Sequence, residues 1–559
     1  MTIAQAFEIA LQHHQAGRLA EAEAIYRQVL AAEPQHADAL HLLGVIAHQM
    51  GLNDRAVAMI RQAIALNPHS SIFHSNLGEA YRKLGQLDEA IAAYRQALQL
   101  QPDLTSAHNN LGIALKDHGQ IADAIAAFRT ALRFHPNSSV AHSNLLLDLH
   151  YPADLDADAI FREHLRWDEV HARPLANGIK SHLNDPDPDR GLRVGYVSPD
   201  FRDHSVSFFL ENLLASHDRG QVEVFCYADL LRADPVTARL RQSAGNWREI
   251  TAMSAAEAAE LIRRDQIDIL VDLAGHTALK NLLIFARKPA PVQVTYLGYC
   301  DTTGLSAMDY RFTDAQADPP GTTEHLHTEQ LVRLPEVLAC FRPSDEAPPV
   351  SPLPALARGQ VTFASFHTMA KLNDRLLEHW GAILQQTPDS RLMMVASGLE
   401  QISTRQRCIK FFERHGIGAE RLVFEGRVSL SLYLALHHEV DLLLDSHPFN
   451  GHTVSCHALW MGVPVVTLAG ACYCSRMVAS VLSSVGLPEL IAHTPAAYVE
   501  IARALAVDRR RLAALRSGLR ERMAGSPLMD APRFARNVEQ AYRQMWRTWC
   551  KQRSSRPTA

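Results

Sequence analysis

With 559 residues, the chain is longer than one hydrophobic core usually holds, and its formal net charge of -5 gives no overall electrostatic reason to expect nucleic-acid binding. No window approaches the roughly 20 apolar residues of a membrane span, the first helical segment lacks the apolar core of a signal peptide, and the eight cysteines include no CxxC pair. These features exclude a membrane-spanning protein and a disulfide framework, so we expect a cytoplasmic protein of several domains.

The first quarter of the chain repeats with a period of 34 residues. Four prolines and four glycines recur at this interval without slippage: Pro34, Pro68, Pro102, Pro136, Gly17, Gly51, Gly85 and Gly119. The pattern is typical of tetratricopeptide repeats, which are paired helices that stack into a superhelix with a concave, peptide-binding face. We expect four full units and a partial fifth over residues 1–150.

Helices and a polar linker are expected to follow over residues 151–190. Apolar residues at helical spacing between Asp154 and His182 predict helices that cap the repeats. The run from Asn184 to Asp189 alternates aspartate with proline. Alternating aspartates can be mistaken for a DxD metal site, but the prolines favour a linker, so no metal site is predicted.

After Gly191 the pattern changes to short buried strands separated by helices, in one series within 191–355 and a second within 356–559. The expected strands are 192–198, 222–228, 267–274, 292–298 and 309–314, then 361–366, 391–396, 421–425, 440–445 and 464–468. Two such series predict two doubly wound, Rossmann-like domains that face a cleft. The last helical segment, 531–550, has an apolar face with which it can cross back onto the first domain.

The strongest chemical signal follows the strand that ends at Asp445. A loop with Asn450 and Gly451 leads there into an apolar helix that begins near Thr453. Unpaired N–H groups at a helix N-terminus favour an anion such as phosphate, although Asn450 and Thr453 are also ordinary capping residues. Lys371 follows the first strand of the same domain, where its charge can neutralise a leaving diphosphate; the alternative is a solvated lysine.

In the first domain, His204 and His276 each follow a strand. A histidine above the sheet can accept a hydroxyl proton or hold a sugar hydroxyl. The chain has 29 histidines, so coincidence is the competing explanation for both.

Together these motifs resemble the O-linked N-acetylglucosamine transferases, which modify serine and threonine of proteins. The resemblance is carried by segments 193–201 with His204, 289–299, and 450–453, and it follows the family's order along nearly the whole chain. It implies tetratricopeptide repeats followed by a GT-B pair of Rossmann-like lobes. It also implies inverting transfer from UDP-N-acetylglucosamine to acceptor proteins held in the repeat groove, with no metal or other cofactor.

The resemblance further implies roles for individual residues. Lys371 matches the family lysine on the diphosphate, His204 matches a histidine once proposed as general base, and Glu260 is a second candidate for that role. The implied nucleotide-sugar contacts are Leu297, Gly298, Thr368, Lys371, Arg427, Val428, Gly451, His452, Thr453 and His457. Asn76, Asn110 and Asn144 resemble a ladder that grips the acceptor backbone, because an amide both donates and accepts; the alternative is that they are only polar surface residues.

Departures from the family pattern leave the donor open. Val454 replaces a second threonine, His457 replaces an acidic residue on the ribose, and Leu430 and Tyr433 replace a lysine and a histidine near the uracil. Plant relatives of this architecture resemble O-fucosyltransferases, so GDP-fucose is the alternative donor. A peptide-binding repeat scaffold with inactive transferase lobes is the alternative from another class.

Overall fold

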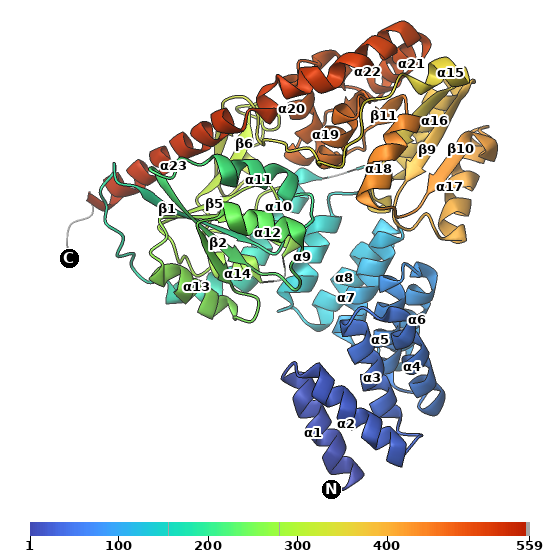
Figure 1. Ribbon diagram of the computed structural model, residues 1–559, viewed down its shortest axis with the longest axis vertical. Coiled ribbons are helices and arrows are strands. Elements are labelled where there is room, and N and C mark those ends of the chain that lie inside the picture. Colours follow the sequence, from blue (N-terminus) through green and yellow to red (C-terminus); the bar gives the residue numbers. More distant parts are fainter. Residues whose placement is uncertain (155, 279, 555–559) are drawn as a thin grey trace. The chain divides into compact units, whose positions relative to one another are not determined.

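The computed structural model describes residues 1–154, 156–278 and 280–554, and these residues form two compact units (Figure 1). The first unit holds residues 1–141 together with the short stretches 368–370 and 396–408. The second unit holds most of the remaining chain, including both α/β lobes.

The helices of the first unit form the pairs that the repeat predicts. They are α1 (Ile3–Gln15) with α2 (Leu19–Ala32), α3 (Ala37–Gln49) with α4 (Asn53–Leu66), α5 (Ser71–Lys83) with α6 (Leu87–Leu100), and α7 (Thr105–Asp117) with α8 (Ile121–Phe134). Gly85, in the turn between α5 and α6, has a φ of 77°, a left-handed conformation that favours glycine. At Gly78 a Cβ would lie 2.7 Å from the Tyr94 ring, so only glycine lets the two helices of this unit approach so closely.

The first lobe is a parallel sheet whose strand order reverses between β1 and β4. In spatial order the strands are β3 (Asn246–Glu249), β2 (Val222–Ala228), β1 (Leu192–Ser198), β4 (Ile269–Asp272), β5 (Val292–Thr295), β6 (Tyr310–Asp314) and β7 (Gln330–Leu334). The helices that connect the central strands include α11 (Ser207–Ser216), α12 (Pro235–Ser243), α13 (Ala255–Arg264) and α14 (Asn281–Phe285).

The second lobe repeats this arrangement and reverses between β8 and β11. Its strands, in spatial order, are β10 (Leu422–Glu425), β9 (Ser390–Val395), β8 (Val361–Ser365), β11 (Leu442–Leu444), β12 (Val465–Leu468) and β13 (Ile491–Ala492). The main helices are α16 (Asp374–Gln386), α17 (Ile402–Arg414), α18 (Leu430–Leu436), α19 (His452–Trp460), α20 (Met477–Ser484), α21 (Pro495–Val507) and α22 (Arg509–Ala524). Ligands bind at such reversals, outside the carboxyl ends of the strands.

The predicted fold class, repeats followed by two Rossmann-like lobes, is confirmed. Each of the ten predicted strands is present, but the sequence pattern missed β3, β7 and β13. Strands β3 and β7 are mostly half-buried or exposed at the sheet edges and lack an apolar run, and β13 has only two residues. The domain limits themselves stay predictions.

Two further elements, α10 (Ala157–Trp167) and α23 (Ala531–Ser554), are packed within the second unit. The final helix α23 runs along the first lobe, as its apolar face suggested (Figure 1). The Tyr542 and Tyr196 hydroxyls lie 3.1 Å apart, and Trp546 Nε1 donates to the Asp187 carbonyl at 2.9 Å. The linker therefore contacts α23 through the backbone of Asp187.

Candidate active site

Lys371 and the loop after β11 meet at the strand-order reversal of the second lobe. Lys371 Nζ donates to the Asn450 carbonyl at 2.6 Å and lies 4.1 Å from the centre of the Phe449 ring. Desolvation lowers the pKa of Lys371 to about 8, while the Asp445 carboxylate opposes that shift. At neutral pH the ammonium form therefore still dominates, and its charge is poorly solvated. The predicted contact of Lys371 with a diphosphate stays a prediction.

Asp445 holds the loop in shape. Its Oδ1 accepts hydrogen bonds from the backbone N–H groups of Ser446 at 2.9 Å and Gly451 at 2.8 Å, and its Oδ2 accepts from the Thr467 hydroxyl at 2.6 Å. His367 Nε2 is 3.2 Å from the same Oδ1. A Cβ at Gly451 would lie 2.2 Å from that Nε2, so this position requires glycine. Sequence reasoning missed these roles of Asp445 and His367, although a buried aspartate at a strand end was the available signal.

Helix α19 begins immediately after this loop. Gly451, His452 and Thr453 are thus at its N-terminus, where unpaired N–H groups and the helix dipole favour an anion. Helix α19 also carries buried polar atoms with no hydrogen-bond partner among the described residues: His452 Nε2, Ser455 Oγ and His457 Nδ1. Unpaired buried groups of this kind are costly and point to a ligand that supplies the missing partners.

Aromatic side chains from the first lobe pack against both histidines of α19. The His452 ring stacks on Phe209 with centres 4.6 Å apart, and the His457 ring meets Phe208 edge-on at 4.7 Å. Desolvation lowers the pKa of each histidine to about 4, so both are neutral at physiological pH. Sequence reasoning missed Phe208 and Phe209 because their α19 partners lie in the other lobe.

Tyr433 borders the same region from α18, with its ring centre 5.7 Å from that of His457. A cavity of about 320 Å³ opens nearby, between Asp203, Phe208 and Arg342 on one side and Leu430 on the other. Val428 is half-buried and Arg427 exposed in the segment just before α18. Their predicted contact with a nucleotide sugar stays a prediction.

His204 lies in the loop after β1, at the carboxyl edge of the first sheet. Its Nδ1 accepts from the Val206 N–H at 3.4 Å and lies 3.6 Å from the Asp200 carboxylate. Desolvation lowers its pKa, which keeps the imidazole neutral and able to accept a proton. Glu260 lies elsewhere, within α13, where its carboxylate pairs with Lys180 at 2.8 Å. The geometry of the strand ends thus favours His204 as the candidate base.

His276 has a structural environment. It is buried, with Nδ1 3.0 Å from the Ser143 hydroxyl and Nε2 2.9 Å from the Thr303 carbonyl. Both ring nitrogens are engaged, so His276 is not available to a substrate in this arrangement.

Leu297 and Gly298 follow β5 at the same edge of the first sheet. Leu297 has a φ of 72°, a strained conformation for a residue with a branched side chain. A Cβ at Gly298 would lie 1.8 Å from the Leu273 carbonyl oxygen, so the loops after β4 and β5 touch through their backbones. The predicted contact of Leu297 and Gly298 with a sugar stays a prediction.

The remaining predicted contacts belong partly to the first unit. Asn76 Nδ2 lies 2.8 Å from His41 Nε2, and Asn110 Oδ1 accepts from Asn109 Nδ2 at 3.2 Å. Thr368 is exposed and also part of the first unit, whereas Asn144 is in the second. The asparagine ladder and the contact of Thr368 with a donor stay predictions.

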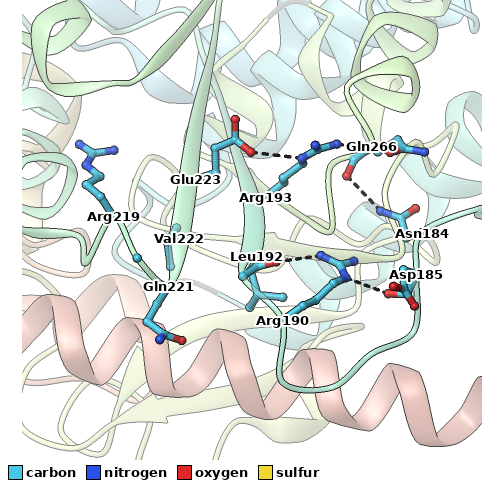
Figure 2. Close-up of a pocket in the computed structure, with 12 residues that line it drawn as sticks. Asn184, Asp185, Arg190, Leu192, Arg193, Arg219, Gln221, Val222, Glu223 and Gln266 are labelled. Atoms are coloured by element: carbon cyan, nitrogen blue, oxygen red, sulfur yellow. Dashed lines mark hydrogen bonds and ion pairs between the residues drawn. The ribbon is translucent and has the colours of Figure 1, made fainter.

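A second cavity, of about 380 Å³, lies at the opposite end of the first sheet, where β1 and β2 begin (Figure 2). Arg190 Nε donates to the Asp185 carbonyl at 2.9 Å, and Arg193 Nε donates to the Glu223 carboxylate at 3.2 Å. These arginines are occupied by protein partners, and the amino ends of the strands are not where this fold binds ligands.

Within residues 1–154, 156–278 and 280–554, no three His, Cys, Asp or Glu side chains are grouped so that they could hold a metal ion. None of the helices in these ranges is both long and apolar enough to cross a bilayer.

The sequence and the structure were compared with known protein families, curated proteins and solved structures. Residues 170–340 and 353–538 match the model of Glycosyl transferase family 41, and residues 13–77 and 78–119 match tetratricopeptide-repeat models. The chain is 41% identical over 416 residues to a Petunia hybrida protein named probable UDP-N-acetylglucosamine-peptide N-acetylglucosaminyltransferase SPINDLY, covering 72% of this chain and 44% of that protein. It is 26% identical over 513 residues to a Caenorhabditis elegans UDP-N-acetylglucosamine-peptide N-acetylglucosaminyltransferase, covering 70% and 44%. The chain thus spans less than half of these relatives.

Among solved structures, a mutant of the O-GlcNAc transferase of Thermobaculum terrenum is similar over almost the whole length. The TM-score is 0.80 at 36% sequence identity, and the match covers 99% of this chain and 98% of that one. The similarity therefore extends over both the repeats and the two lobes.

Proposed function

Since the chain belongs to glycosyl transferase family 41, we propose that it transfers N-acetylglucosamine from UDP-N-acetylglucosamine to serine and threonine hydroxyls of proteins. The family membership confirms the resemblance of segments 193–204, 289–299 and 450–453. The observation that carries the proposal is the pairing of Lys371 with the loop that opens α19, 2.6 Å from the Asn450 carbonyl. The names of its relatives support the choice of donor.

The proposed reaction is one in-line displacement with inversion and without a metal. The acceptor oxygen attacks the anomeric carbon while the bond to the diphosphate breaks, so negative charge grows on the leaving phosphate. The Lys371 ammonium and the N–H groups of His452 and Thr453 supply a positive field at one place, while the Gly451 N–H is already bonded to Asp445. Preorganised charges of this kind stabilise the transition state more than the bound substrate.

His204 is the proposed proton acceptor, with Glu260 as the second candidate. Its neutral imidazole, at the carboxyl edge of the first sheet, can take the hydroxyl proton of an acceptor. We propose that acceptor peptides bind in the groove of the repeats, where Asn76, Asn110 and Asn144 would bind the peptide backbone. We also propose a cytoplasmic location, supported by eight cysteines that are all free thiols.

A GDP-fucose donor is the second candidate, and one observation favours it. The ribose position would face His457, a neutral ring among Phe208, Phe341 and Tyr433, in place of the usual carboxylate. The nucleoside end of the pocket therefore differs from that of a typical UDP site.

Isothermal titration of UDP and of GDP into the purified protein, without added metal, tests the proposal. Tighter binding of UDP is the expected result. Tighter binding of GDP would move the assignment to fucose. If the folded protein bound neither nucleotide, the chain would instead be a peptide-binding scaffold with inactive lobes.

A further inference from the structure

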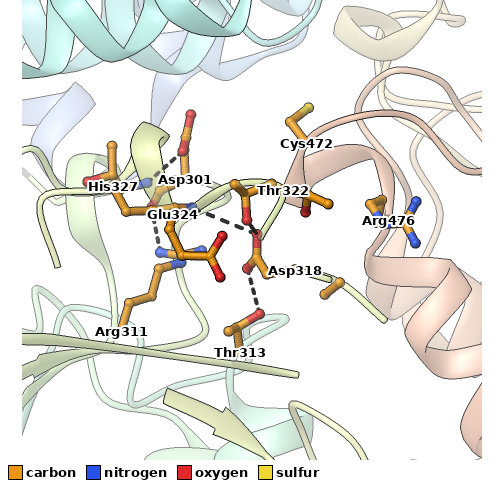
Figure 3. A network of polar contacts seen from close by, with 12 residues as sticks. Asp301, Arg311, Thr313, Asp318, Thr322, Glu324, His327, Cys472 and Arg476 are labelled. Atoms are coloured by element: carbon orange, nitrogen blue, oxygen red, sulfur yellow. Dashed lines mark hydrogen bonds and ion pairs between the residues drawn. The ribbon is translucent and has the colours of Figure 1, made fainter. Parts of the chain in front are cut away.

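Two thiols face each other in the loop between β12 and α20. Cys472 and Cys474 flank Tyr473 in a short 3₁₀ turn, and their sulfur atoms are 3.3 Å apart. Cys474 is buried, whereas Cys472 is partly exposed. Figure 3 shows Cys472 at the edge of a polar network that includes Asp301, Asp318 and His327.

Cys472 has the chemistry of a reactive thiol. A hydrogen bond from the Cys474 thiol and a second from the Ser475 hydroxyl lower the pKa of Cys472 to about 7, against desolvation and the nearby Asp301 carboxylate. Burial instead raises the pKa of the thiols outside this loop: Cys226, Cys300, Cys340, Cys408, Cys456 and Cys550. Because the thiolate is the nucleophile, its lowered pKa together with its partial exposure favours Cys472 as the site of oxidation.

The cysteine loop is bonded directly to the candidate active site. The backbone N–H of Asn450 donates to the Cys474 carbonyl at 2.9 Å, and the carbonyl of the same Asn450 accepts from Lys371 Nζ at 2.6 Å. Asn450 therefore connects the backbone of Cys474 to the Lys371 ammonium through two successive hydrogen bonds.

We propose that Cys472 and Cys474 form a reversible disulfide, and that this modification loosens the Asn450 loop. A disulfide needs a sulfur–sulfur distance of about 2.05 Å with a restricted torsion. Closing the present separation between residues only two apart requires the backbone of the turn to move. The Cys474 carbonyl moves with that turn, so the Asn450 N–H loses its partner.

The chemistry requires a hydroperoxide as oxidant. The Cys472 thiolate attacks one peroxide oxygen, the O–O bond breaks, and the other oxygen leaves as hydroxide or alkoxide and takes a proton from water. The Cys474 thiol then attacks the sulfenic sulfur, the S–S bond forms, the S–O bond breaks and water leaves. The two thiols have lost two electrons to the peroxide, and a dithiol reductant reverses the change.

The disulfide can form whether or not the proposed function is right, but a role in controlling glycosyl transfer rests on the proposed function. The two measurements that test the disulfide therefore do not depend on enzymatic activity. After a titration with hydrogen peroxide, the peptide containing Cys472 and Cys474 should lose the mass of two hydrogens and regain it with dithiothreitol. Hydrogen exchange of the Asn450 amide should accelerate about tenfold in the oxidised protein, the equivalent of one lost hydrogen bond.

Matched variants make the test specific. Cys474→Ser keeps the backbone carbonyl but cannot form the disulfide, so peroxide should leave its Asn450 exchange unchanged. Cys550→Ser removes a thiol of α23 and should respond as the natural protein does. Absence of the disulfide, or a disulfide with unchanged Asn450 exchange, would overturn the proposal. Failure of the reduced protein to bind either nucleotide would overturn the proposed function and leave this inference standing.

Discussion

Replacing Lys371 by methionine should abolish most glycosyl transfer while leaving the fold intact. Methionine keeps an unbranched side chain, but it removes the ammonium that lies over the Phe449 ring and donates to the Asn450 carbonyl. Loss of one preorganised donor at a developing negative charge typically costs about 10²–10³ in kcat, or roughly 3–4 kcal/mol. We expect a loss of this size or greater, because Lys371 contributes a full charge.

Stability should change little, for a reason that the structure supplies. Lowering the Lys371 pKa from 10.5 to about 8 corresponds to about 3 kcal/mol against the charged form in the folded protein. The unfolded chain binds more protons between these values, so this penalty is fully present below pH 8 and fades as the pH rises toward 10.5. Methionine removes that penalty but also the charged hydrogen bond to Asn450, worth about 1.5–3 kcal/mol. The two contributions nearly cancel.

The assay is transfer of labelled N-acetylglucosamine to protein acceptors, with urea unfolding of each variant alongside. Lys410→Met is the matched control, because Lys410 is an exposed lysine of the second lobe. It should retain full activity. If Lys371→Met kept more than a tenth of the natural turnover while it stayed folded in the urea control, the assignment of Lys371 to the leaving group would be wrong.

Other perturbations test the base, the loop and the buried histidines. His204→Ala should lower kcat about 10²–10⁴-fold with little change in nucleotide affinity, whereas Glu260→Gln should leave kcat near normal; the reverse order would exchange their roles. Gly451→Ala should abolish nucleotide binding in a titration and lower Tm, because its Cβ would meet an imidazole at 2.2 Å, whereas Gly518→Ala, with nothing within 4 Å, should not. Stability to urea should fall as the pH drops from 6.5 to 4, because the unfolded chain protonates its histidines near 6.5 whereas burial lowers the pKa of His457, His452 and others in the folded protein. His457→Gln should reduce this slope by the share of one histidine, and an unchanged slope would contradict the reasoning.

Local patterns in the sequence predicted most of the fold. The repeat was visible because glycine and proline recur where the turns require them, and the central strands were visible because they are buried on both faces. Strand β3, Asn246–Glu249, was not predicted because it is mostly half-buried at the edge of its sheet.

The candidate site was predictable only in part. Lys371 and the loop before α19 stood out because they follow strands at the reversal of a Rossmann-like sheet. The stacking of His452 on Phe209 could not be predicted, since no local pattern relates positions so far apart in the chain. The same limit left His204 and Glu260 unranked from the sequence, and their relative roles stay a prediction.

The position of α23 has a consequence for how the protein is made. This helix is synthesised after the whole second lobe, yet its Tyr542 and Trp546 bond to residues that belong with the first. During translation, the apolar surface of the first lobe that α23 covers therefore stays exposed until the second lobe and α23 have left the ribosome. The two lobes cannot mature strictly in the order of translation, and a holding chaperone has a defined interval in which to act.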